Sequence, residues 1–250
     1  MYILDELMKL AVMFIALDGS KVIGLAAYRK QRDGSAWISS ARTHPDYRRK
    51  GVAAAIMKAC EDHAEKDGAN ALRLWTEVDN PAGRALASKM GFKEVGRFAQ
   101  MTAPSRPGVL GEELVKLRYA DDMWSAVETS ELMRATQSHS ALGFGFVRIS
   151  KPVLKALVGD GFVFGWDRNI ATLSWRIFAG CSILEAQLLR GDFAEALSDL
   201  RTIAGENDIE RVYSWLPHIE GVLDTAKRAG YASIEWGKEA LLFEKPVIRE

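Results

Sequence analysis

The sequence predicts an α/β fold with a mixed sheet, built as two similar domains in tandem. Short apolar runs rich in β-branched and aromatic residues alternate along the chain with longer segments of helical periodicity. Both patterns stop within residues 102–113, where two prolines and two glycines cluster, so this segment is a linker candidate. We therefore expect one domain over residues 1–103 and a second over residues 112–250.

In the first half, three strands precede a helix over residues 52–66, which Gly68 closes. A fourth strand follows, and then a second helix that opens at Asn80-Pro81 and closes at Gly91-Phe92. The four expected strands cover residues 13–16, 21–29, 36–42 and 72–77.

The second half repeats this order of elements. Strands are expected at residues 161–166, 171–179, 183–189 and 211–216. One helix follows Gly191-Asp192 and another ends at Gly230-Tyr231. Gly51 and Gly91 are 40 positions apart, and Gly191 and Gly230 are 39 apart. Duplication of one α/β unit would give this spacing, and chance similarity of two α/β halves is the alternative.

Composition excludes several classes of function. The 33 Lys and Arg residues balance the 33 Asp and Glu residues, so no surplus is left for the dense basic face that a polyanion needs, and we expect no nucleic-acid partner. Cys60 and Cys181 fit neither a disulfide framework nor a zinc site. The apolar run at residues 10–17 is shorter than the roughly 20 residues of a membrane span. We expect a cytoplasmic protein without a membrane contact or a metal.

Residues 39–53 run from the end of a strand into a helix and carry the strongest functional signal. The first N–H groups of a helix have no intrahelical partners, and the helix dipole adds partial positive charge there, so a pyrophosphate suits the place. Gly51 and Ala53 leave the backbone open. Arg48, Arg49 and Lys50 add positive charge. The alternative interpretation is a solvated basic turn before a helix.

The run Arg48-Arg49-Lys50-Gly51-Val52-Ala53 resembles the acetyl-CoA loop of the GCN5-related N-acetyltransferases (GNAT). In that family the usual order is Arg or Gln, two residues, Gly, one residue, then Gly or Ala. The preceding Pro45 and Tyr47 and the later Asn80-Pro81 and Gly91-Phe92 also match, so the resemblance covers residues 21–98. It implies two GNAT-like domains and acetyl-CoA as co-substrate.

The resemblance also implies which residues hold this co-substrate. Backbone contacts to the pantetheine would come from Ala41, Arg42 and Thr43. The pyrophosphate would meet the segment from Arg49 to Ala53. Asn80 would add a side-chain contact, and it is also a plain helix N-cap.

The sequence departs from the family at the catalytic acid. Many members carry a tyrosine four residues before the Gly of Gly-Phe, and here that position is Ala87. The acid is then water or a residue of the second half. Glu77, at a strand end, is the candidate base, with a solvated carboxylate as the alternative. Asp79, His44 and His63 are weaker candidates.

The opening of the chain is a second departure, because the family's first strand and helices have little room before residue 13. Residues 114–119 resemble a family first strand that could pair with either half, and a helix over residues 121–134 would open the second half. At the position that matches the loop, the second half has Arg190-Gly191-Asp192-Phe193. A carboxylate and a bulky ring at that helix start predict that this half does not bind CoA.

These features favour an N-acetyltransferase that moves the acetyl group of acetyl-CoA directly to an amine in a ternary complex. The amine belongs to a small molecule or a protein, and a homodimer is left open. A catalytically impaired acetyl-CoA sensor is the first alternative. An α/β protein without a cofactor is the second.

Overall fold

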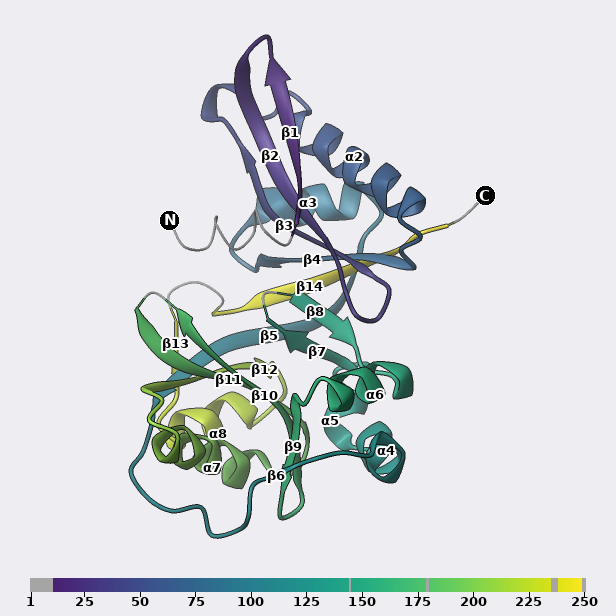
Figure 1. Ribbon diagram of the computed structural model, residues 1–250. Coiled ribbons are helices and arrows are strands. Elements are labelled where there is room, and N and C mark those ends of the chain that lie inside the picture. Colours follow the sequence, from purple (N-terminus) through teal and green to yellow (C-terminus); the bar gives the residue numbers. More distant parts are fainter. Residues whose placement is uncertain (1–10, 144, 179, 235–237, 249–250) are drawn as a thin grey trace. The chain divides into compact units, whose positions relative to one another are not determined.

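The computed structural model describes residues 11–143, 145–178, 180–234 and 238–248 (Figure 1). The chain divides into two compact units. Unit 1 comprises Met1–Val95 and Leu241–Glu250, and unit 2 comprises Gly96–Ala240. The helices and strands of both units form a mixed α/β structure, as predicted.

Unit 1 holds five strands in the spatial order β1-β2-β3-β4-β14. The first three are antiparallel neighbours, while β3 and β4 are parallel because helix α2 (Val52–Lys66) connects them. Helix α3 (Pro81–Lys89) follows β4. The strands are β1 (Val12–Asp18), β2 (Lys21–Lys30), β3 (Ala36–Thr43), β4 (Ala71–Glu77) and β14 (Ala240–Pro246).

The core of unit 1 lies between α2 and the sheet. Ile56, Met57, Cys60 and Ala64 lie on one face of α2 and are buried against apolar side chains of β2 and β3. The predicted bounds of this helix, residues 52–66, are confirmed. The polar residues on its other face include Lys58, which pairs with Asp62 at 2.9 Å.

The C-terminal strand β14 belongs to unit 1, which differs from the expected division at residues 103 and 112. Leu241 and Phe243 are buried in the unit 1 core. Glu244 accepts a hydrogen bond from Arg73 Nε at 2.6 Å, and the Arg73 side chain is only 4% exposed. The same guanidinium also pairs with Asp33. A contact between segments so far apart in the chain leaves no local signal in the sequence.

Unit 2 has the strand order β5-β12-β11-β10-β9-β6, with β13 beside β5 and a separate hairpin of β7 and β8. Its strands are β5 (Lys93–Pro104), β6 (Val115–Lys116), β7 (His139–Leu142), β8 (Gly145–Arg148), β9 (Val163–Trp166), β10 (Asn169–Phe178), β11 (Cys181–Arg190), β12 (Arg211–Pro217) and β13 (Ala232–Ser233). Its helices are α4 (Ala120–Glu128), α5 (Glu131–Ala135), α6 (Lys151–Gly159), α7 (Phe193–Glu206) and α8 (Val222–Arg228).

The predicted repetition of elements is confirmed in the topology. In unit 2, β9, β10 and β11 are antiparallel neighbours, and β11 is parallel to β12. Helix α7 connects the parallel pair, as α2 does in unit 1, and α8 follows as α3 does. The two repeats differ in the long strand that follows the second helix, which is β5 in the first repeat and β14 in the second. Most of β5 lies in unit 2, where it pairs with β12, while β14 lies in unit 1.

Three expectations need correction. The helix expected at residues 121–134 is two helices. The first ends at the C-cap Thr129, and Ser130 caps the second by accepting a hydrogen bond from Met133 N at 3.1 Å. The expected linker is shorter at its start, since β5 runs on to Pro104. Residues 114–119 supply only the short strand β6, which pairs with β9 in unit 2.

Across the described segments, no helix combines the length and the apolar character needed to span a bilayer.

Candidate cofactor-binding site

The strand that leads into the candidate site, β3, is paired with β4 only at its beginning. The parallel ladder joins the first two residues of β3 to Leu72 and Arg73 and goes no further. On that side, the backbone groups of the later residues of β3 have no strand partner in the described ladder. Ala41, Arg42 and Thr43, expected to contact the pantetheine, lie on this open edge. An extended ligand with amide groups could pair with it as a strand would.

A β-bulge bends β3 just before this open stretch. The register between β2 and β3 shifts between Leu25 and Ala27. Ser40, opposite the shift, adopts a left-handed backbone with φ of 55°. A bulge of this kind turns a strand away from its neighbour, which accounts for the short ladder with β4.

The segment that joins β3 to α2, residues 44–51, is called the basic loop below. It begins at His44, whose N–H donates to Ile23 O at 2.8 Å. A short 3₁₀ turn, Pro45–Tyr47, follows. Arg48, Arg49 and Lys50 come next, and all three are exposed. The loop therefore presents three cationic side chains to solvent directly before the helix.

Tyr47 connects the basic loop to the end of β1. Its hydroxyl donates to Asp18 Oδ2 at 2.7 Å, and this hydrogen bond raises the pKa of Tyr47. The ammonium groups of Lys21 and Lys50 lie 5.2 and 5.1 Å from the ring centre. The tether joins residues 29 positions apart, and the sequence alone did not predict it.

Helix α2 begins without a capping side chain. Its N-cap is Gly51, which makes no side-chain capping hydrogen bond, and the first turn contains no acidic residue. Gly51 has φ of 84°, and a Cβ there would meet no heavy atom within 4 Å. The left-handed backbone therefore favours glycine at this position. The close approach of a phosphate that the sequence led us to expect stays a prediction. The helix start keeps its N–H groups and its partial positive charge available to an anion.

Gly24 on β2 lets the first turns of α2 lie close against the sheet. A Cβ at this position would come within 2.8 Å of the side chains of both Val52 and Ile56. Any larger residue would push the helix start away from the sheet, so Gly24 helps to place the basic loop. The sequence signal for this is an isolated glycine inside a strand. Gly24 was not among the residues predicted for the site.

Asn80 acts as the N-cap of α3. Its Oδ1 accepts from Gly83 N at 3.0 Å, and its Nδ2 donates to Thr76 Oγ1 at 2.9 Å. The capping role expected from sequence is confirmed, with Pro81 in the first turn. The contact of Asn80 with a cofactor stays a prediction.

The two positions expected to matter for catalysis differ sharply in exposure. Glu77 is the last residue of β4 and is half-buried, and its carbonyl accepts from Asn80 N at 3.1 Å. Ala87 is 1% exposed and belongs to the unit 1 core. The position that carries tyrosine in many GNAT enzymes thus lies within the packed core here, where a ring would have to displace its neighbours.

The two histidines considered from sequence have structural roles. His44 Nδ1 accepts from Asp46 N at 3.3 Å and so caps the 3₁₀ turn. The His63 ring packs edge-on against Tyr28, with 4.7 Å between ring centres. Among the described residues, no three His, Cys, Asp or Glu side chains are grouped so that they could hold a metal ion.

The matching helix of unit 2, α7, satisfies its own N-terminus. Asp192 Oδ1 accepts from Ala194 N at 2.8 Å and from Glu195 N at 3.1 Å. Glu195 adds a second carboxylate to the first turn and pairs with Arg168 at 2.7 Å. Two carboxylates at this helix start would repel a phosphate, which supports the expectation that this half binds no CoA.

Comparison with known proteins connects this geometry to a family. The sequence profile of the acetyltransferase (GNAT) family matches residues 3–92, which include β3, the basic loop and α2. A mycothiol acetyltransferase of Parafrankia sp. is 34% identical over 99 residues, and the match covers 38% of this chain and 29% of that protein. The chain thus matches less than a third of this relative's length.

Two solved structures show the same fold over nearly the whole chain. A GCN5-related N-acetyltransferase from Sphaerobacter thermophilus has a TM-score of 0.61 at 12% identity, covering 96% of this chain and 82% of that one. A tandem GNAT protein from the clavulanic acid biosynthesis pathway has a TM-score of 0.53 at 12% identity, covering 96% and 84%. At such identities the likeness concerns the fold alone.

Proposed function

We propose that this chain, whose residues 3–92 match the sequence profile of the acetyltransferase (GNAT) family, transfers an acetyl group from acetyl-CoA to an amine. The observation that carries the proposal is the uncapped start of α2, at Gly51, directly after three exposed basic residues. An uncapped helix start of this kind is suited to a pyrophosphate. The open edge of β3 beside it is suited to the amide groups of a pantetheine arm.

The residues present fit acetyl-CoA as a co-substrate. The N–H groups from Gly51 to Ala53 would hold the pyrophosphate, and the side chains of Arg48, Arg49 and Lys50 would add charge. The backbone of residues 41–43 would bind the pantetheine along β3. When bound, acetyl-CoA supplies an acetyl group activated as a thioester.

The chain's own contribution to the chemistry is to position an amine and to take its proton. An amine attacks only as the neutral base, so an acceptor that arrives as an ammonium ion must lose a proton. We assign this role to the Glu77 carboxylate, half-buried at the end of β4. Ala87, at the position of the family's tyrosine, has no proton to donate. The leaving thiolate of CoA would then take its proton from water.

The burial of Ala87 favours a second candidate function. A CoA-binding domain that lacks the family's usual acid could serve as a sensor of acetyl-CoA, without turnover. Both functions require acetyl-CoA to bind, but only the enzyme transfers its acetyl group to an amine. A turnover assay therefore separates them.

The assay incubates the full chain with acetyl-CoA and a panel of polyamines, small primary amines and peptides with free N-termini or lysines. It measures thiol release and the mass of each acceptor. We expect one acetylated amine for each thiol released. Glu77→Gln should lower turnover by roughly 10²–10⁴-fold, while Asp79→Asn, which changes the exposed carboxylate two residues away, should not. Binding of acetyl-CoA without acetylation of any amine would support the sensor.

A further inference from the structure

The parallel strand pair of unit 2 separates along its length, as the parallel pair of unit 1 does. The described ladder between β11 and β12 ends at Glu185 and Tyr213, although both strands continue for several residues. The space between residues 186–190 and residues 214–217 is called the unit 2 slot below. It corresponds to the open edge of β3, which begins where the ladder with β4 stops.

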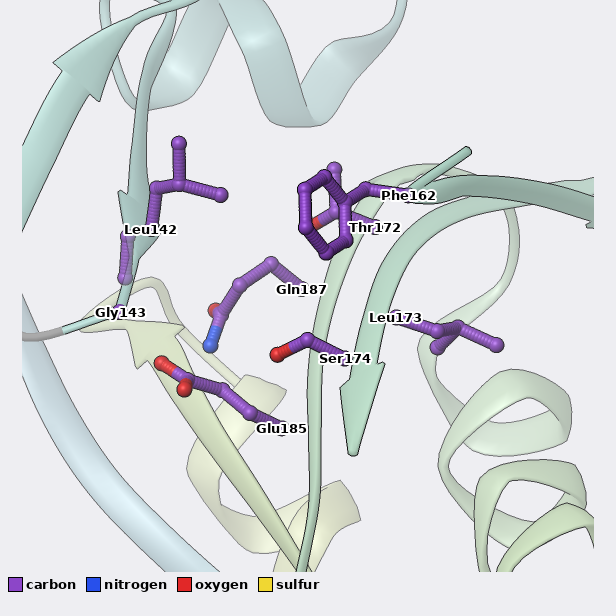
Figure 2. Close-up of a pocket in the computed structure, with 9 residues that line it drawn as sticks. Leu142, Gly143, Phe162, Thr172, Leu173, Ser174, Glu185 and Gln187 are labelled. Carbon is purple, nitrogen blue, oxygen red and sulfur yellow. The ribbon is translucent and has the colours of Figure 1, made fainter. Parts of the chain in front are cut away.

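Gln187 fills the unit 2 slot with its own side chain. The residue is 4% exposed, and its Oε1 accepts a hydrogen bond from Trp215 N at 3.1 Å. Figure 2 shows the Gln187 side chain extended from its strand, with the amide at the far end. In a continued parallel ladder, a main-chain carbonyl of β11 would accept from this N–H. The side-chain amide therefore replaces a main-chain amide across the gap between the strands.

Little free space is left beside the Gln187 amide. The hollow that it shares with Leu188, Trp215 and Leu216 measures about 20 Å³, which suits one water molecule. The unit 2 slot is thus closed to a larger guest. Nε2 has no hydrogen-bond partner among the described residues, so the amide is held by its oxygen.

The matching position of unit 1 carries a shorter side chain. Counted from the last pair of each ladder, Gln187 and Ser39 both lie two residues further along their strands. A serine hydroxyl is attached directly to Cβ, whereas glutamine carries its amide beyond a further methylene group. Ser39 is therefore too short to bridge separated strands. It leaves the edge of β3 to a ligand, while Gln187 covers the equivalent edge of β11.

We propose that Gln187 excludes the pantetheine arm of CoA from unit 2, because it holds the place that a ligand amide would take. This role rests on the proposed function, which assigns the pantetheine to the matching edge of β3. It adds a second block to the one at α7, since Asp192 repels the phosphates and Gln187 excludes the amide arm. A shorter side chain at position 187 should open the unit 2 slot to an amide ligand that has no phosphate.

The test uses pantetheine, with its thiol kept reduced, because it carries amide groups but no phosphate. Hydrogen exchange read by mass spectrometry follows one peptide from β12 and one from β3 in the full chain. In Gln187→Ala, pantetheine at about ten times its dissociation constant should slow exchange of the β12 peptide about tenfold. In the wild type, pantetheine should leave exchange of this peptide unchanged.

Two control variants separate an opened slot from a general loosening of the strands. Gln187→Met keeps the volume of the side chain without its amide, so the slot should stay filled and β12 should not respond to pantetheine. Gln100→Ala removes another buried glutamine, 6% exposed on β5, which borders the opposite side of β12. It should not respond either. If Gln187→Ala does not fold, Gln187→Asn, shorter by a methylene group, carries the same expectation.

Unchanged exchange of β12 in the shortened variants would overturn the role of Gln187, and so would equal slowing in Gln187→Met or Gln100→Ala. The β3 peptide reports on the proposed function separately. Slowing of β3 in every protein and of β12 in none would leave the proposed function standing without the role of Gln187. Slowing of β12 in Gln187→Ala, with β3 unaffected in every protein, would instead contradict the assignment of the pantetheine to β3.

Discussion

Replacing Phe243 by alanine should destabilise unit 1, although the residue lies more than 140 positions after the rest of that unit. Phe243 is 6% exposed and packs in the unit 1 core. Removal of a buried phenylalanine side chain costs about 3–5 kcal/mol, from the lost burial and the cavity left behind. Since a domain of about 100 residues loses about 4–8 °C of Tm per kcal/mol, unit 1 should unfold at least about 12 °C lower.

The matched control is Ile248→Ala on the same terminal segment. Ile248 is 80% exposed, so its loss should change the free energy of unfolding by less than about 0.5 kcal/mol. Hydrogen exchange read by mass spectrometry reports the two units separately. Peptides from β2 and α2 should lose protection in Phe243→Ala and keep it in Ile248→Ala.

Two results would refute this reasoning. Equal protection of β2 and α2 in both variants would mean that Phe243 is not part of the unit 1 core. If Phe243→Ala lost protection only in α7, with β2 and α2 unchanged, the C-terminal strand would belong to unit 2. That is the division expected from sequence, with a second domain over residues 112–250.

Three further outcomes follow from named contacts. Asp192→Ala should lower the free energy of unfolding of unit 2 by about 1 kcal/mol in urea. Asp192→Asn should retain most of the stability of the wild type, because asparagine also caps a helix. The affinity for acetyl-CoA should be the same in both variants. Burial raises the pKa of Cys60 to about 12, so at pH 8 only about one in 10⁴ of its thiols is ionised. Ellman's reagent should label Cys181 alone in the native protein, and labelling of both cysteines before unfolding would contradict that burial. Ala87→Tyr should destabilise unit 1 by about 1–3 kcal/mol in thermal unfolding and leave turnover unimproved, because the position is packed.

The parts of the fold that the sequence predicted are those with local signals. Helix α2 carries an apolar face at regular spacing and glycines at both ends, and its bounds matched residue for residue. The strands before it were found to within two residues at either end. Within a single repeat, hydrophobic period and turn residues were sufficient.

The parts that the sequence did not predict depend on distant contacts. Residues 241–243 form a short apolar run that could belong to either unit, and only pairs such as Arg73 with Glu244 place them. Helix α6 and the β7–β8 hairpin were not expected either. They lie in the stretch of the second half that has no counterpart in the repeat.

The candidate site also combines features with a local sequence signal and features that depend on distant contacts. The basic loop and the bare helix start could be found from a contiguous run of residues. The Tyr47–Asp18 tether and the close approach at Gly24 required the fold. The burial of Ala87 also appeared only once the core of unit 1 was known.

Calorimetric titration with acetyl-CoA of the wild type, Gly51→Asp and Gly221→Asp tests the central claim most directly. Both glycines are N-caps with left-handed φ, 84° and 78°, and neither helix start has a side-chain cap. Both positions also have open space around a Cβ, so the two substitutions carry a similar backbone penalty. Only Gly51→Asp places a carboxylate at the basic loop. We predict one mole of acetyl-CoA per chain for the wild type and Gly221→Asp, and no binding for Gly51→Asp. Equal affinity in all three proteins, or two moles per wild-type chain, would contradict the account.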